Sequence, residues 1–119
     1  MRRARLQKRA RLLNASEFNR VFDEAVRSSE QYFTVLARLN NFDFPRLGLA
    51  ISKKRARLAV TRNRLKRIIR ENFRLNQHEL CTADYIVLAG PKGSSASNSQ
   101  LSRSLEKHWQ KLKKLCAES

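Results

Sequence analysis

The chain has 119 residues, of which 26 are Lys or Arg and 10 are Asp or Glu, so its formal net charge is +16 at pH 7. The length fits one domain with a modest core, and a hydrophobic content of 41% excludes a wholly disordered chain. No apolar run reaches the ~18–20 residues of a membrane-spanning helix, and no signal-peptide core follows the basic N-terminus. We therefore expect a cytoplasmic protein with a polyanionic partner: nucleic acid first, an anionic membrane second.

The N-terminal part predicts a basic arm followed by a helix. Residues 1–11 carry six basic side chains and no acid, which is typical of an arm that contacts phosphates or of a solubilising tail. Asn14 and Glu17 have the spacing of a capping box, so the helix should begin near Asn14. Phe18 and Phe22 are i,i+4 neighbours on it. Its other apolar residues are Val21, Ala25 and Val26.

Three later segments have the pattern of strands. Residues 30–40 alternate with both faces partly apolar, and residues 46–52 place large apolar side chains on one face and small ones on the other. Residues 84–89 are almost continuously apolar, as in an inner strand. A loop at 90–97 then precedes a last helix from about Ser99. The small residues of the second strand, Gly48, Ala50 and Ser52, leave room for a ligand on that face.

The most basic stretch runs from Lys53 to Arg74 and holds ten Lys or Arg against one acid, Glu71. From about Thr61, which is an acceptable N-cap, this stretch fits a helix with one apolar face. The other faces carry guanidinium groups, which bind phosphate in a bidentate way. Surface helices usually intersperse acids for i,i+4 pairing, so we favour a nucleic-acid contact over a merely solvated face. The apolar face comprises Leu65, Ile68, Ile69 and Phe73.

The remaining residue types give no catalytic or metal-binding signature. Cys81 and Cys116 are expected to be free thiols rather than a disulfide, as in a reducing compartment. His78 and His108 have no ligand partners at metal-site spacing and are expected at the surface or the edge of the core. The ten acids are scattered, and no Gly-rich phosphate loop follows a strand. We therefore expect a binding function rather than a self-contained protein catalyst.

The aromatic residues bear on the kind of nucleic acid. Phe18, Phe22 and Phe33 are suited to stacking on unpaired bases, while Lys and Arg bind the backbone. Duplex RNA hides its base edges in a deep groove, so the aromatics favour a single strand as part of the target. Two alternatives stay open. One is a general RNA-binding protein, such as a ribosomal component or an RNA chaperone; the other places the basic helix in a DNA major groove.

Residues 61–74, with the sequence TRNRLKRIIRENFR, closely resemble the Arg-Asn-Arg signature helix of the bacterial ribonuclease P protein family. Residues 11–22, 45–54 and 84–89 are similar to the family's opening, second strand and later strand. The resemblance covers nearly the whole chain in the family's order, and the sequence is most similar in character to the gammaproteobacterial branch.

The resemblance implies a single α+β domain over residues 1–119, a small sandwich with a central mixed sheet. It implies a left-handed strand–helix–strand crossover through the signature helix, as in the second domain of ribosomal protein S5, against the general right-handed rule. It also implies a non-catalytic subunit of a ribonucleoprotein endoribonuclease, with the active site and most of the Mg²⁺ on the RNA and no metal bound by the protein alone. The implied partners are one catalytic RNA, in a 1:1 complex, and precursor tRNA, not DNA or a membrane.

The resemblance also implies two groups of site residues. One group binds the catalytic RNA, and the other forms a cleft between the first helix and the sheet that holds the 5′ leader of precursor tRNA. The first group is Arg62, Asn63, Arg64, Lys66, Arg67 and Arg70. The second is Phe18, Phe22, Phe33, Val35 and Ala50, with Lys53 and Lys54 at the rim.

Overall fold

The computed structural model describes residues 10–11 and 14–117, and a four-stranded sheet organises them. Within the described chain, the spatial order of the strands is β1-β2-β4-β3. β2 pairs antiparallel with β1 and β4, whereas β3 pairs parallel with β4. The continuously apolar β4 is therefore an inner strand, as its sequence predicts. The strand bounds are β1 (Val26–Ser29), β2 (Phe33–Leu39), β3 (Arg46–Ala50) and β4 (Ala83–Ala89).

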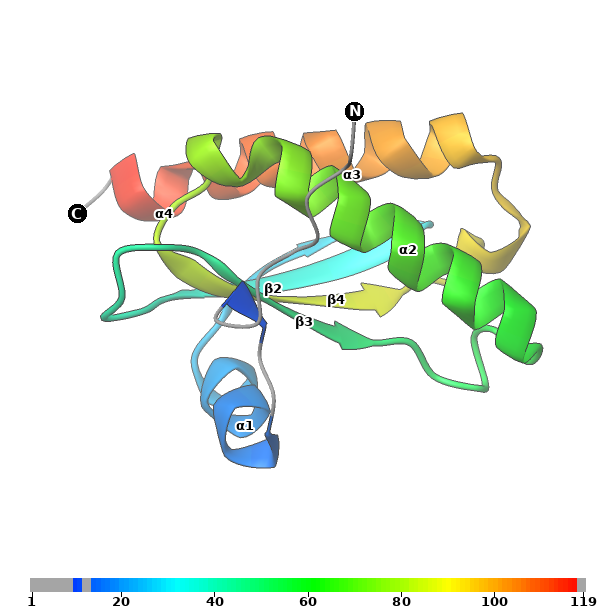
Figure 1. Ribbon diagram of the computed structural model, residues 1–119, viewed down its shortest axis with the longest axis horizontal. Coiled ribbons are helices and arrows are strands. Elements are labelled where there is room, and N and C mark those ends of the chain that lie inside the picture. Colours follow the sequence, from blue (N-terminus) through cyan, green and yellow to red (C-terminus); the bar gives the residue numbers. More distant parts are fainter. Residues whose placement is uncertain (1–9, 12–13, 118–119) are drawn as a thin grey trace, which may run out of the picture.

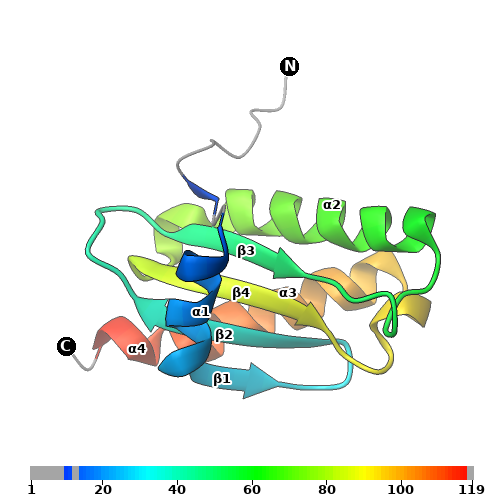
Figure 2. The same ribbon diagram turned by 90° about the horizontal axis from the view of Figure 1, so that it is seen from below.

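Helices cover both faces of the sheet. Figures 1 and 2 show α2 and α3 on one face and α1 alone on the other. α2 connects the parallel strands β3 and β4, which gives the expected crossover; its handedness stays a prediction. No helix in the described ranges is long and apolar enough to cross a membrane. The helices are α1 (Ala15–Asp23), α2 (Ala59–Asn76), α3 (Asn98–Leu112) and α4 (Lys114–Ala117), with short 3-10 turns η2 (Gln77–Glu79) and η3 (Gly93–Ser95).

α1 begins with the predicted capping box. Asn14 Oδ1 accepts from the Glu17 N–H at 2.9 Å, and Glu17 Oε1 accepts from the Asn14 N–H at 3.3 Å. The helix ends at Asp23, and β1 starts at Val26. The expectation that Ala25 and Val26 belong to the helix is therefore wrong. This edge strand is only four residues long, and its apolar start continues the spacing of the helix, so the sequence pattern hid it.

α2 begins two residues before the predicted N-cap. Its N-cap is Leu58, which makes no side-chain cap, and the first helical hydrogen bond runs from the Arg62 N–H to Leu58 O at 3.1 Å. Thr61 therefore lies inside the helix. The predicted apolar face is confirmed, with Leu65, Ile69 and Phe73 fully buried and Ile68 partly so.

The core between the helices and the sheet contains an aromatic cluster. Phe73, Tyr85 and Trp109 meet edge to face with ring centroids 5.6–6.0 Å apart, a favourable geometry for aromatic rings. The Trp109 Nε1–H donates to Oδ1 of buried Asn72 at 2.7 Å, which satisfies both polar groups and links α2 to α3. Burial raises the pKa of Tyr85 to about 12.

A buried ionic cluster fixes α1 against the sheet. Arg46 of β3 donates from Nε and Nη2 to the two carboxylate oxygens of Asp84, at 2.8 and 2.7 Å, and from Nη1 to Glu17 Oε2 at 2.6 Å. The Asp84 hydrogen bond contributes most to raising the pKa of Arg46. Because Glu17 also caps α1, one carboxylate both starts the helix and anchors it.

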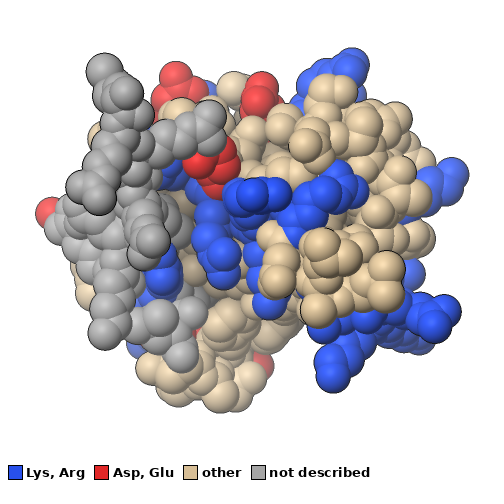
Figure 3. Space-filling model, turned by 45° about the vertical axis from the view of Figure 1, so that its right-hand side comes forward, with Lys and Arg blue, Asp and Glu red and all other residues tan. Residues whose placement is uncertain are grey.

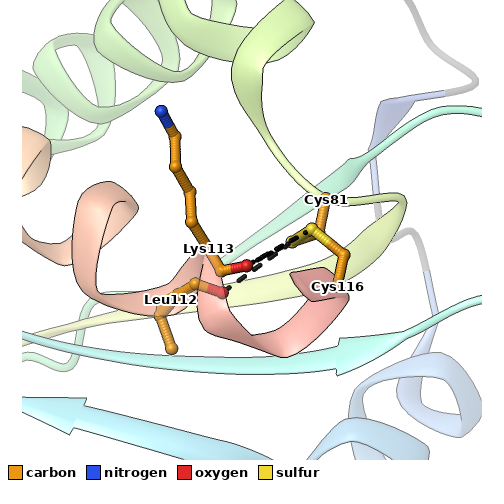
Figure 4. Close-up of a disulfide and its surroundings, with 4 residues drawn as sticks. All are labelled: Cys81, Leu112, Lys113 and Cys116. Atoms are coloured by element: carbon orange, nitrogen blue, oxygen red, sulfur yellow. Dashed lines mark hydrogen bonds between the residues drawn. A yellow bond between two sulfur atoms is a disulfide. The ribbon is translucent and has the colours of Figure 1, made fainter. Parts of the chain in front are cut away.

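The two cysteines form a disulfide, which corrects the expectation of free thiols. Their Cα atoms are 5.6 Å apart, although the residues are separated by 35 positions in sequence. Figure 4 shows Cys81, which lies just before β4, joined to Cys116 of α4. The bond lies beside the backbone carbonyls of Leu112 and Lys113. Sequence spacing carries no information about this proximity, which arises because α3 brings the C-terminal end back over the start of β4.

His108 lies deeper than expected, in a polar cluster between α3 and the β1–β2 turn. Its Nδ1 is 2.7 Å from Ser28 Oγ and its Nε2 is 3.4 Å from Glu30 Oε1. Burial lowers the pKa of His108, and Glu30 offsets only part of this. Burial alone would raise the pKa of Glu30, but hydrogen bonds from Ser104, the backbone N–H groups of Phe33 and Tyr32, and His108 lower it.

Candidate nucleic-acid interface

One face of the sheet packs against α2 and α3, and the other lies beside α1. Alternate side chains along β2 point to opposite faces. Phe33 and Val35 are fully buried in the core under α2 and α3. Their Cα partners on β4 are Ala89 and Val87, which face the same core. The prediction that Phe33 and Val35 line a cleft beside α1 is therefore wrong, because the pleat points them to the opposite face.

The face beside α1, called here the α1 face, carries the alternate residues. Leu36 and Ile86 pack against Val21 of α1, with Ala50 and Leu88 partly buried at their side. Thr34 pairs with Leu88 across the strands and is also partly exposed. Ala50 therefore lies on this face together with Thr34, Leu36 and Leu88, which were not predicted there from the sequence; a role of this face in leader binding stays a prediction. Both faces of β2 read as apolar, so alternation alone could not choose between them.

α1 holds Phe18 and Phe22 beside this face. Phe18 is partly buried against the small cluster on the α1 face, whereas Phe22 is 47% exposed. Their ring centroids are 6.5 Å apart. An exposed ring next to a partly open apolar sheet face is suited to stacking on an unpaired base.

A basic loop, residues 52–57, connects β3 to α2. Lys53 and Lys54 are exposed in it, and their place at the rim of a leader cleft stays a prediction. Ser52 O accepts from the Ala56 N–H at 3.0 Å and Ser52 Oγ from the Arg55 N–H at 3.2 Å. The loop is thus a defined turn that presents cations, and not an extended tail.

α2 presents a second group of cations to the outside. Lys66 is partly exposed and Arg67 and Arg70 are exposed, as is the uncharged Asn63. Arg67 and Asn63 line a surface pocket of about 420 Å³ near the start of the helix. Figure 3 shows several groups of Lys and Arg side chains on the face that includes this end of α2, with few acids among them. Such a surface has the charge and the forked donors that bind a phosphate backbone.

The two arginines of the Arg-Asn-Arg sequence are already engaged within the protein. Arg62 Nη1 donates to the carbonyls of Ala56 and Arg57, both at 2.9 Å. Arg64 donates from Nη1 to Asn98 Oδ1 at 2.6 Å and from Nη2 to Ala96 O at 3.0 Å. The basic residues of the helix thus fall into two groups: those with internal contacts, and outward cations whose side chains make no hydrogen bond to a described residue.

The arm predicted at residues 1–11 lies mostly outside the described residues. Arg11 forms a parallel β-bridge with Leu47, and Ala10 is buried. Among the described residues, no three His, Cys, Asp or Glu side chains are grouped as ligands for a metal ion.

Taken together, the partly exposed α1 face, the basic loop and the outward cations of α2 are typical of a small α+β protein that binds RNA. The family model "Ribonuclease P" matches residues 6–113, so the chain belongs to the ribonuclease P protein family.

Relatives and solved structures agree with this family. The chain is 50% identical over 109 residues to the ribonuclease P protein component of Methylococcus capsulatus, covering 92% of this chain and 85% of that protein. It is 41% identical to that of Photobacterium profundum, covering 97% and 98%. The structure of the Staphylococcus aureus RNase P protein matches with a TM-score of 0.79 at 33% identity, covering 87% and 94%. The Thermotoga maritima protein matches with a TM-score of 0.74 at 30% identity, covering 92% and 97%.

Proposed function

We propose that this chain is the protein subunit of a ribonuclease P that removes the 5′ leader of precursor tRNA. The observation that carries the proposal is the pairing of two surfaces: an apolar face with an exposed ring beside α1, and outward cations on α2. The family match over residues 6–113 supports the same role. A general RNA-binding protein is not favoured, because charge alone does not require the aromatic and small residues of the α1 face.

The α1 face would bind the leader. Phe22 would stack on a leader base, and Ala50 would leave room for the chain to lie on the sheet. Lys53 and Lys54 would contact leader phosphates. The corrected set of sheet residues replaces Phe33 and Val35 with Thr34, Leu36 and Leu88.

The outward cations of α2 would bind the catalytic RNA, which contains the active site. Lys66, Arg67 and Arg70 are the cations of this group whose side chains make no hydrogen bond to a described residue, in contrast to Arg62 and Arg64. We propose a 1:1 complex, with the Mg²⁺ of the hydrolytic reaction held mainly by RNA. We also propose that the protein acts in the cytoplasm.

Binding to the catalytic RNA and to an unrelated structured RNA of equal length, measured at the same salt concentration, tests this role. We expect preference for the catalytic RNA and, in the assembled complex, tighter binding of precursor tRNA with a long leader than of the same tRNA with a one-nucleotide leader. Equal affinity for both structured RNAs, with no leader effect, would instead indicate a general RNA binder.

A further inference from the structure

The basic loop gathers cations that repel one another. Lys53, Lys54, Arg55 and Arg57 are exposed within five consecutive positions, and none forms an ion pair with a described residue. Only Ala56 of this loop is buried, at 2% exposure. Repulsion between like charges at this spacing favours open arrangements of the loop. The two hydrogen bonds to Ser52 close the turn within the loop, so a fixed presentation of these cations also needs a contact that ties the loop to α2.

Arg62 supplies that contact from the first turn of α2. Its Nη1 donates to the last two carbonyls of the loop, Ala56 O and Arg57 O, both at 2.9 Å. Its backbone N–H donates to Leu58 O at 3.1 Å, which begins the helix. A single residue thus joins the start of α2 to the end of the loop, and its Nη1 protons face carbonyl oxygens instead of a phosphate.

We infer that Arg62 is a positioning residue for the leader: it holds the basic loop so that Lys53 and Lys54 are presented beside the α1 face. This inference rests on the proposed function and reassigns one member of the signature helix from the catalytic RNA to the substrate. The physical basis is preorganisation, since a loop that is already ordered loses less conformational entropy when a ligand binds.

Arg67 provides the contrast on the same helix. It is exposed and lines the 420 Å³ pocket, and its side chain makes no hydrogen bond to a described residue. Removing Arg67 should weaken assembly with the catalytic RNA. Removing Arg62 should instead weaken the use of the leader, although the two residues are only five positions apart.

The experiment compares R62A, R62K and R67A in the assembled holoenzyme. Two quantities are measured for each: the Kd for the catalytic RNA, and the ratio of precursor-tRNA affinities with a long and a one-nucleotide leader. For R62A we expect the leader ratio to fall by about tenfold, or ~1.4 kcal/mol, with the Kd for the catalytic RNA within about twofold of wild type. R62K, which keeps a cationic donor, should restore part of the ratio. R67A should show the reverse pattern.

A double-mutant cycle separates positioning from a general loss of structure. Adding R62A to the K53A/K54A variant should cause no further loss of the leader ratio, because the cations that Arg62 positions are already absent. A full additional loss would overturn the inference, as would an R62A variant that loses catalytic-RNA affinity like R67A while keeping the leader ratio. A wild-type holoenzyme with no leader effect at all would overturn both this inference and the proposed function. The K53A/K54A variant leaves the Arg62 hydrogen bonds in place, so it tests the role of the loop even if R62A folds poorly.

Discussion

Arg46 shows how one residue sets the geometry of the α1 face. Its guanidinium binds Asp84 in a bidentate way and reaches Glu17 of α1, and the Arg46 and Asp84 side chains are 8% and 3% exposed. A buried charge whose partner is removed is costly because it is left uncompensated. The position of α1 over the sheet therefore depends on this cluster as well as on apolar contact.

The D84A substitution should lower the free energy of unfolding by about 3–5 kcal/mol, because Arg46 keeps only Glu17 as an ionic partner. Urea denaturation measures the change. E24A serves as the control, since Glu24 is 76% exposed and pairs with Arg38 at 3.4 Å, and such surface pairs contribute at most about 1 kcal/mol. Similar losses for the two variants would show that burial of the cluster is not decisive.

His108 should make stability depend on pH. Its folded-state pKa is lowered by burial, so the unfolded chain takes up the proton first as the pH falls. The stabilisation is therefore complete above the ordinary pKa of about 6.5 and is lost as the pH drops through the lower folded value. We expect the wild-type free energy of unfolding to fall between pH 7 and pH 5 more steeply than that of H108Q. Parallel curves would contradict this assignment.

At the scale of the elements, α1 presents one aromatic residue that can be removed without emptying the core. Phe22 is 47% exposed, whereas its neighbour Val21 is fully buried. F22A should weaken binding of a long-leader precursor by about 1–3 kcal/mol, the range for base–aromatic stacking, with little change in unfolding. V21A is the matched control and should lower stability instead. Normal leader binding by folded F22A would remove Phe22 from the interface.

The elements also explain which parts of the structure could be predicted from the sequence. The capping box placed α1, and helical spacing identified the buried face of α2, because both signals are local. The strand β1, and the direction in which the β2 side chains point, could not be predicted in the same way. An edge strand of four residues has little pattern, and a strand apolar on both faces needs the tertiary arrangement to decide which face meets α1.

The site could also be predicted only where the sequence signal is local. Exposed cations such as Arg67 and Lys53 follow from charge and periodicity. The internal contacts of Arg62 and Arg64 do not, since their acceptors are backbone carbonyls of two loops and the side chain of Asn98 at the start of α3, and the sequence does not determine where these groups lie.

At the scale of the whole molecule, the disulfide ties the C-terminal helix to the start of β4. It links residues 35 positions apart. Closing a loop of that length lowers the entropy of the unfolded chain, which stabilises the folded state by about 3–4 kcal/mol. Reductant should therefore lower the free energy of unfolding of the wild type by up to this amount and leave C116S unchanged. Disulfides are rare in the cytosol, so the oxidised fraction of the protein has to be measured. Alkylation of the free thiols in the freshly isolated protein gives this fraction. Equal wild-type stability with and without reductant would contradict a stabilising role.

Cleavage of a 5′-labelled precursor tRNA at low, near-physiological Mg²⁺ tests the central claim most directly. Three reactions are compared: the catalytic RNA alone, this protein alone, and the two together. We predict efficient cleavage at the mature 5′ end only when both are present, since the protein's positive surface reduces the electrostatic cost of bringing two RNAs together. No stimulation by folded protein would contradict a role as the ribonuclease P subunit.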